Sequence, residues 1–363
     1  MRHKLFIILL IIFFLQLLFR IYQYKDNYLT PFNSQYWKER YLKSQWVVPN
    51  SKESIGDDGL YAYSGWEYIH GSDPSLLNAE VPPLGKYLIG FSEIIFYNQN
   101  IFALLSGLLV LSALYILNKI IFKDNFLALI PVMLLSADTL FYNQLKAPYL
   151  DCLYLGLLIL IFIFILKEKF ILANIFIGLM MATKASAPTF ILVAVVITCY
   201  LSYMKDRPLI KKFCFYLYVS ILIFLLTYTR YFFLNHNIID FIRLQKWVLN
   251  FYDSGAKGIP GAVWQMLISG KWSTWWGTVQ QVTEWNILWP LSLIASIYYF
   301  YKVLPKRRIY KSILLGFWII AYLLFLSFVP VWPRYLLMIL PFMYTLLVWV
   351  LSKDIARLLR RYN

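Results

Sequence analysis

The chain has 363 residues, of which 61% are hydrophobic, 19% are aromatic and only 14% are charged. An average soluble domain carries about 25% charged residues, so this composition excludes a soluble globular protein and indicates a protein that crosses a membrane several times. A net charge of +16 would suggest nucleic-acid binding in a soluble chain, but here most of the excess lies in short loops beside apolar segments. The expected partner is therefore the lipid bilayer and not a nucleic acid.

Apolar segments long enough to cross a hydrocarbon core as helices, about 20 residues each, recur along the whole chain. The first follows a short basic start and has no small-residue cleavage site after it, which favours an anchor over a signal peptide. Eight crossings are predicted directly, at 5–22, 99–121, 125–143, 149–166, 213–234, 286–303, 310–329 and 335–352. Segment 170–203 is too long for one crossing and is interrupted by Lys184 and Pro188, so we expect two short helices there.

The sequence thus predicts an all-α polytopic membrane protein with about ten transmembrane helices, in one domain of residues 1–363. If the N-terminus is cytoplasmic, the inner loops hold nineteen basic and four acidic residues, against fifteen and fourteen elsewhere. This is the charge distribution of the positive-inside rule, and it predicts that both termini lie in the cytoplasm. A single crossing at 170–203 would reverse every later loop and place the basic segment "LPKRRIYK" outside.

Two long regions, 23–98 and 235–285, fall on the predicted outer side. Both are rich in aromatic residues, as in "YWKERYLKSQW" and "GKWSTWWG". Tryptophan and tyrosine favour the headgroup level of a membrane, where an apolar ring and a polar edge are both accommodated. We therefore expect short interfacial helices, the first with Thr30 as its N-terminal cap and Pro31 in its first turn.

The first outer region contains an unusual pair of adjacent carboxylates, Asp57 and Asp58, followed one helical turn later by Tyr61. Such a pair can divide the work of catalysis, because one acid can accept a proton from an attacking hydroxyl while the other orients a group or a metal ion. The simpler interpretation is a solvated helix start. Further along, "AEVPPLGK" contains two prolines that restrict the backbone and direct Glu80, although such a turn before a helix is common.

More ionisable residues stand at the outer ends of the other predicted crossings. Ionisable residues near the hydrocarbon core are costly and normally pair or line a water-filled cavity, which makes them functional candidates. The aspartates could instead be helix-end residues bound by neighbouring amides, and the cations could extend to lipid headgroups. The functional alternative is a phosphate site, since arginine offers a planar fork and lysine a point charge. These residues are Asp138, Lys146, Asp151, Lys184 and Arg334.

Taken together, these segments resemble the membrane glycosyltransferases of the GT-C fold, in particular protein O-mannosyltransferases and phospholipid-carrier-dependent glycosyltransferases. "DDGLYAY" is similar to the family's Asp-Glu motif, with Asp58 in place of Glu, and "EVPPLGK" is similar to "HPPLGK", with Val81 in place of His. "LKAPYLD" is similar to a motif in which Arg precedes Asp by five residues, with Lys146 in place of Arg. "GLMMATK" and "WPRY" are similar to two later motifs, and all five occur in the family's order.

The resemblance implies the GT-C fold and an inverting transfer of a sugar, of hexosyl or mannosyl type, from a polyprenyl-phosphate carrier. The acceptor would be a hydroxyl of a protein Ser or Thr, a lipid or a glycan on the extracytoplasmic face of the cell membrane. The resemblance implies catalytic roles for Asp57, Asp58 and Glu80, with Asp57 as the base. It implies substrate or phosphate binding by Tyr61, Lys86, Asp138, Lys146, Asp151, Lys184, Arg334 and Tyr335. The resemblance implies no particular cofactor and leaves a divalent cation as an open alternative.

A multi-pass transporter or lipid flippase is the alternative function. Transporters usually show repeated halves and a polar site near the bilayer midplane, built from broken helices. Here the unusual charges gather at one predicted end of the crossings and no internal repeat is visible. Only the interruption within 170–203 favours a transporter.

Overall fold

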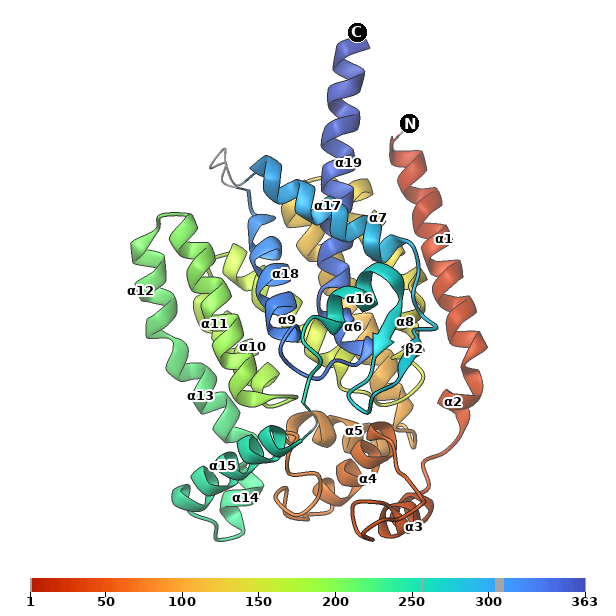
Figure 1. Ribbon diagram of the computed structural model, residues 1–363, viewed down its shortest axis with the longest axis vertical. Coiled ribbons are helices and arrows are strands. Elements are labelled where there is room, and N and C mark those ends of the chain that lie inside the picture. The colour runs from red at the N-terminus through yellow and green to blue at the C-terminus, as the bar shows by residue number, and fades with distance from the viewer. Residues whose placement is uncertain (1, 256, 304–309, 363) are drawn as a thin grey trace.

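The computed structural model describes residues 2–255, 257–303 and 310–362, and its regular structure is almost entirely helical (Figure 1). A helix stands at each of the ten predicted crossings. These helices are α1 (Arg2–Gln23), α6 (Asn100–Phe122), α7 (Asn125–Ala137), α9 (Asp151–Leu166), α10 (Phe170–Met181), α11 (Ser186–Tyr203), α12 (Arg207–Phe215) continued by α13 (Leu217–Leu226), α17 (Leu288–Val303), α18 (Ile313–Leu326) and α19 (Leu340–Tyr362). Within the described residues, four helical stretches are long and apolar enough to span a membrane by themselves: His3–Gln23, Asn100–Phe122, Ser186–Tyr203 and Arg207–Leu226.

The remaining elements are short. They are α2 (Lys25–Leu29), α3 (Ser34–Lys43), α4 (Asp57–Ile69), α5 (Leu84–Ile95), α8 (Thr139–Asn143), α14 (Thr229–Phe233), α15 (Ile238–Ser254), α16 (Ala262–Ser269), the strands β1 (Lys271–Ser273) and β2 (Val279–Gln281), and the 3₁₀ helix η1 (Pro333–Met338). Residues 304–309, which include three basic residues of the charge argument, lie outside the described residues.

The predicted division of 170–203 into two helices is confirmed. Helix α10 ends at Met181 and α11 begins at Ser186, and Ala185 between them has a left-handed backbone with φ of +51°. Pro188 does not cause the break, because it lies in the first turn of α11, where the backbone N–H has no partner inside the helix. The break at 182–185 leaves Lys184 outside both helices.

The two chain termini lie at one end of the bundle, and α3, α4, α5, α14 and α15 lie at the opposite end (Figure 1). Region 23–98 and the first part of region 235–285 therefore share one end, as the sequence predicted. The later part of the second region differs, because α16 packs against α17 and is followed by an antiparallel β1–β2 hairpin in which Lys271 faces Gln281. Gly270 and Gly277 permit this hairpin, since both have a positive φ that other residues rarely adopt.

The expected cap at Thr30 is wrong. Helix α3 begins three residues later, with Asn33 as its cap, and the Asn33 side chain accepts a hydrogen bond of 2.9 Å from the Tyr36 N–H. Thr30 instead closes α2, where its hydroxyl donates to the Asp26 carbonyl at 2.6 Å. Asparagine is among the strongest N-capping residues, so the nearer polar side chain determines where α3 starts.

Helix α9 is the centre of the bundle. It packs against α6 and α10, and residues such as Leu155, Ile159 and Phe162 are completely buried. A helix that is hydrophobic on all sides belongs in a core, which explains why "DCLYLGLLILIFIFIL" contains no polar stripe. The first residue of this fixed helix is Asp151, whose position is therefore fixed as well.

Helices α4 and α5 pack closely through two glycines. A Cβ atom on Gly65 would lie 2.6 Å from the Lys86 carbonyl oxygen, and one on Gly90 would lie 2.4 Å from the Gly65 carbonyl oxygen. Such distances are too short for any side chain, so only glycine allows this approach. The contact sets the position of the acidic pair, at the start of α4, relative to Glu80, just before α5.

Cysteine accessibility tests which side of the membrane this end faces. After the three native cysteines are replaced, a cysteine at exposed Ser54 is expected to react with a membrane-impermeant thiol reagent in intact cells. A cysteine at exposed Lys167, in the tight turn between α9 and α10, is expected to react only after the cells are opened. Labelling of position 167 from outside would reverse the predicted orientation.

Candidate active site

The acidic pair forms the first turn of α4. Asp57 and Asp58 follow Gly56, which is extended and provides no side-chain cap. Acidic residues are favourable here because the first N–H groups of a helix lack partners and carry partial positive charge. The pair thus starts a helix, as the simpler interpretation held, and Tyr61 is buried one turn later.

Asp57 belongs to a chain of ion pairs that joins distant parts of the sequence. The Arg334 guanidinium binds the Asp57 carboxylate through NH2, and its Nε lies 3.8 Å from Asp151 Oδ2. The other oxygen of Asp151 pairs with Lys184 Nζ at 2.7 Å. We call Asp57, Arg334, Asp151 and Lys184 the charged cluster. They come from α4, η1, α9 and the break between α10 and α11.

Solvent exposure within the charged cluster increases from one end to the other. The side chain of Asp151 is 4% exposed, those of Lys184 and Arg334 are 17% and 18% exposed, and that of Asp57 is 39% exposed. A buried carboxylate such as Asp151 needs bound cations to remain charged. Asp57 is the accessible end of the cluster, where a molecule from outside would meet it.

Aromatic rings surround the two cations. The Arg334 guanidinium carbon lies 5.5 Å from the ring centre of Tyr149, 5.9 Å from Trp332 and 6.0 Å from Tyr335. Lys184 Nζ lies 5.1 Å from the ring centre of Tyr335, so each cation lies over an aromatic face. Tyr335 was predicted from the sequence, whereas Tyr149 and Trp332 were not, since aromatic residues are common at this level of a membrane protein.

Asp58 and Tyr61 border the charged cluster without an ion pair to it. Burial raises the pKa of Tyr149, and the negative charge of Asp58 adds to this effect, so Asp58 lies near the ring that Arg334 contacts. Among the described residues, the Asp58 side chain makes no ion pair or hydrogen bond of its own. Burial, followed by the charge of Asp57, raises the pKa of Tyr61, so its hydroxyl stays protonated beside the acids.

Lys86 lies at the centre of a buried network behind the acidic pair. Its ammonium group donates to the carbonyls of Asn78 and Val81, at 2.6 and 2.7 Å, and to the Tyr68 hydroxyl at 3.1 Å. Burial lowers the pKa of Lys86 to about 7, while the charge of Glu80 acts in the opposite direction. Because protein oxygens already occupy three donor directions, Lys86 holds the turn at 78–81 in place.

Glu80 lies in that turn, and its side chain is also fixed. Its carboxylate accepts a hydrogen bond from the Asn78 side chain, and its backbone oxygen accepts one of 3.2 Å from the Tyr252 hydroxyl of α15. Burial raises the pKa of Glu80, and the charge of Asp57 adds to this effect. Glu80 is therefore close enough to Asp57 to interact with it electrostatically, and Tyr252 links the second outer region to the same place.

Two predicted site residues lie away from the charged cluster. Asp138 caps α8 by accepting from the Leu140 N–H at 2.8 Å. Its other oxygen accepts from Trp289 Nε1 at 2.8 Å, Asn286 Nδ2 at 3.1 Å and the Tyr344 hydroxyl at 2.5 Å. Lys146 lies over the ring of Tyr24, 5.9 Å from its centre. Asp138 and Lys146 each lie at the end of a predicted crossing, but both contact residues outside the charged cluster.

Two solved structures have a similar fold, both of ArnT from Cupriavidus metallidurans. The structure bound to undecaprenyl phosphate has a TM-score of 0.64 at 17% identity and covers 82% of this chain and 56% of ArnT. The apo structure has a TM-score of 0.61 at 15% identity and covers 82% and 55%. ArnT is a GT-C fold glycosyltransferase. This chain has the GT-C fold.

The GT-C fold and the multi-pass membrane architecture expected from the sequence are thus confirmed. The chain spans a little over half of the length of ArnT. No family model matches the sequence, and no curated protein matches it. At this level of identity the likeness concerns the fold, so activity must be argued from the chain's own residues.

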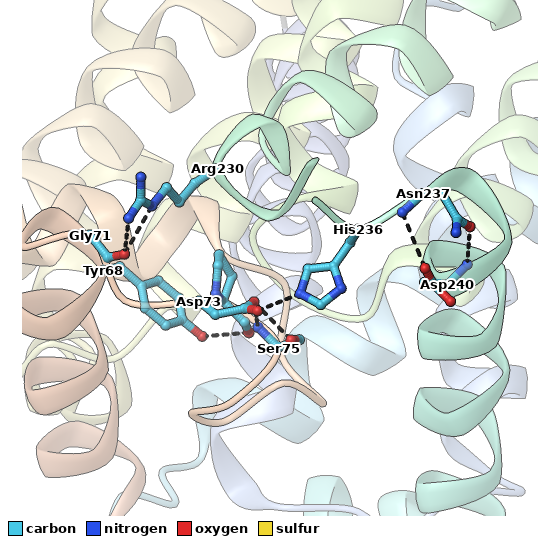
Figure 2. Close-up of polar contacts among 9 residues, drawn as sticks. Tyr68, Gly71, Asp73, Ser75, Arg230, His236, Asn237 and Asp240 are labelled. Atoms are coloured by element: carbon cyan, nitrogen blue, oxygen red, sulfur yellow. Dashed lines mark hydrogen bonds and ion pairs between the residues drawn. The ribbon is translucent and has the colours of Figure 1, made fainter. Parts of the chain in front are cut away.

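A second polar link in this GT-C fold ties the first outer region to the second (Figure 2). His236 Nε2 contacts Asp73 Oδ2 at 2.6 Å, and Arg230 donates through Nε to the Gly71 carbonyl at 2.9 Å. The Tyr68 hydroxyl donates to the Pro74 carbonyl in the same turn. Since Tyr68 also binds Lys86, this link extends to the turn that holds Glu80. Nothing in the sequence indicated a pair separated by 163 positions.

The Asp73 link predicts a pH-dependent contribution to stability. Partial burial alone would raise the pKa of Asp73, but hydrogen bonds from Ser75 and His236 outweigh it and leave the pKa below the ordinary value of 3.8. The contribution is therefore complete above that value and is lost as the pH falls through the folded-state pKa. We expect Asp73→Asn to lower the melting temperature at pH 6, and the difference from wild type to narrow towards pH 3. A difference that stays constant with pH would contradict this account.

The acids of the charged cluster are paired with cations of the chain itself. Among the described residues, no group of three or more His, Cys, Asp or Glu side chains stands close enough to hold a metal ion. The Arg334 guanidinium also contacts both Asp57 and Asp151, where a metal between the two acids would have to bind. The chemistry argued below relies on Arg334 and Lys184 as its cations.

Proposed function

We propose that this chain is an inverting glycosyltransferase that moves a sugar from a polyprenyl-phosphate carrier to a hydroxyl acceptor on the extracytoplasmic face. The observation that carries the proposal is the charged cluster, in which the partly exposed Asp57 pairs with Arg334 and the buried Asp151 pairs with Lys184. ArnT, whose fold this chain shares, has been solved with undecaprenyl phosphate bound. A phosphate-linked carrier is therefore the donor class that fits two cations at this place.

The reaction assigns one task to each group. The acceptor hydroxyl gives its proton to Asp57, and its oxygen attacks the anomeric carbon from the side opposite the phosphate. The bond between that carbon and the phosphate oxygen breaks, the electron pair stays on the phosphate, and the configuration at the carbon inverts. Arg334 and Lys184 stabilise the negative charge of the leaving polyprenyl phosphate. This leaving group is already an anion, so no general acid is needed.

The neighbouring residues are proposed to support these tasks. Asp58 orients the acceptor or the base. Glu80 supplies a second carboxylate, which adds negative charge near the acceptor hydroxyl. Tyr61 and Tyr335 line the sugar site, and Asp151 holds the two cations through its ion pairs. By contrast, Lys86, Asp138 and Lys146 are proposed to be structural, because their observed partners are protein groups outside the charged cluster.

The proposed sugar is a hexose of the mannosyl type, and the acceptor is a protein, lipid or glycan hydroxyl. The test is incubation of the purified chain in liposomes with a panel of radiolabelled polyprenyl-phosphate sugars, each supplied together with protein, lipid and glycan acceptors that carry free hydroxyls. We expect one donor to be consumed, with release of free polyprenyl phosphate, and consumption to require Asp57. Movement of an intact donor across the bilayer without cleavage would instead identify a flippase and overturn the proposal.

A further inference from the structure

The proposed base is engaged in this structure. Asp57 accepts a hydrogen bond and an ion pair from Arg334 NH2. A carboxylate bound in this way is a weaker proton acceptor, because a neighbouring positive charge favours its ionised form. The same guanidinium is the proposed phosphate ligand, so one arginine would have to serve two anions at once.

The cations retain donors that the protein does not use. Within the part of the chain that the structure describes, Arg334 Nε is buried and makes no hydrogen bond, since Asp151 lies 3.8 Å away. Among the same residues, Lys184 donates to Asp151 Oδ1 only, which leaves two of its three N–H groups for another acceptor. A phosphate has several acceptor oxygens and can bind an arginine through two parallel hydrogen bonds. In this structure Asp57 binds the guanidinium through one nitrogen.

The two carboxylates around Arg334 differ in freedom. Asp151 is 4% exposed, starts a buried helix and is held by Lys184. Asp57 is 39% exposed and stands in the first turn of α4. A rotation of its side chain can bring the carboxylate towards the N–H groups at that helix start, which have no side-chain cap. Asp57 is therefore the partner that can leave Arg334.

We propose that the donor phosphate displaces Asp57 from Arg334, so that the catalytic base is released only when the donor is bound. This inference rests on the proposed function. Before the donor arrives, Asp57 neutralises Arg334 and is itself held away from any acceptor. Once phosphate occupies the guanidinium, Asp57 is free to meet the acceptor hydroxyl, and a second anion beside it strengthens it as a proton acceptor.

Competition between Asp57 and phosphate for Arg334 can be measured with the carrier alone. The experiment compares binding of undecaprenyl phosphate to the full chain in nanodiscs for wild type, Asp57→Asn and the matched control Asp58→Asn. Both variants remove one negative charge from the same helical turn, but of these two aspartates it is Asp57 that contacts Arg334. We expect Asp57→Asn to lower the dissociation constant about twofold to fivefold more than Asp58→Asn does, the range that a partly exposed ion pair implies.

The possible results distinguish a failure of the proposed Asp57 displacement from a failure of the proposed function. If both variants bind undecaprenyl phosphate more tightly by the same factor, the effect reflects charge alone, and the proposed displacement of Asp57 by phosphate is wrong. Unchanged or weaker carrier binding by Asp57→Asn would also overturn this displacement. Donor consumption by the wild type in that case would leave the proposed function standing. Absence of both carrier binding and donor consumption would overturn the function itself.

A measurement on the wild type covers the case in which Asp57→Asn does not fold. Modification of Asp57 by a water-soluble carbodiimide, followed by mass spectrometry, reports the accessibility of its carboxylate. We expect modification to increase when undecaprenyl phosphate is added, because the carboxylate leaves Arg334. An unchanged or smaller yield would overturn the exchange.

Discussion

The Asp57→Asn protein is expected to transfer sugar at least about a hundredfold more slowly than wild type, because loss of a general base typically costs 10²–10⁴-fold. Asparagine keeps the size of the side chain but cannot accept the proton of the acceptor hydroxyl. Arg334 would retain Asp151 as a partner, so the structure around it is expected to persist. The measurement is donor turnover by purified protein, with membrane insertion and melting temperature determined in parallel.

Two variants of neighbouring acids make this result specific. Asp58→Asn and Glu80→Gln each remove one carboxylate near Asp57, and both are expected to retain more activity than Asp57→Asn. If Asp57→Asn keeps more than about a tenth of wild-type turnover, its loss is smaller than removal of a base should cause. The base would then be sought in whichever of the other two variants is inactive.

Replacement of Arg334 is expected to have the second largest effect. Arg334→Ala removes the planar fork and leaves Asp57 without its cation, whereas Arg334→Lys keeps a charge but loses bidentate geometry. A hydrogen bond to a charged group contributes about 1.5–3 kcal/mol, so the alanine variant should raise the KM for the donor about tenfold to a hundredfold. The lysine variant should lie between alanine and wild type.

A surface arginine provides the control for this series. Arg243 on α15 has a side chain that is 76% exposed and pairs only with Asp240 one turn away, so Arg243→Ala is expected to match wild type. Activity at the wild-type level in both Arg334 variants would show that Arg334 is an interfacial anchor. A fall in kcat with an unchanged KM would confine Arg334 to stabilising the leaving group and would contradict its role in donor binding.

The sequence predicted the depth of the site along the membrane normal better than it predicted which helices lie side by side around it. A membrane fixes both ends of every crossing helix, so Asp151, Lys184 and Arg334 could be placed at one level from hydropathy and loop charge alone. Which helices are neighbours within the bundle is not contained in those patterns. Asp138 and Lys146 were therefore grouped with the others, although Asp138 binds Trp289 and Lys146 lies over Tyr24.

Short and long-range features were missed for different physical reasons. The strands β1 and β2 contain three residues each, too few for an alternating pattern to be recognised. The pairs Asp57–Arg334 and Asp73–His236 join residues 277 and 163 positions apart, and no local propensity reports on such contacts. The cap at Asn33 was missed because Thr30 offered an equally acceptable local signal three residues earlier.

The wide separation of the charged cluster along the sequence has a consequence for biosynthesis. Asp151 and Lys184 are 33 positions apart and flank the consecutive helices α9 and α10, so the buried acid meets its first cation soon after α9 enters the membrane. Arg334 is made much later, since it lies between the last two helices, α18 and α19. Until then, the arginine that pairs with Asp57 in the folded protein is missing. Because a chain is made from its N-terminus, the protein can insert and pack most of its bundle before the charged cluster is complete. Under the proposed function, truncated or unfinished chains that lack Arg334 would therefore not consume carrier.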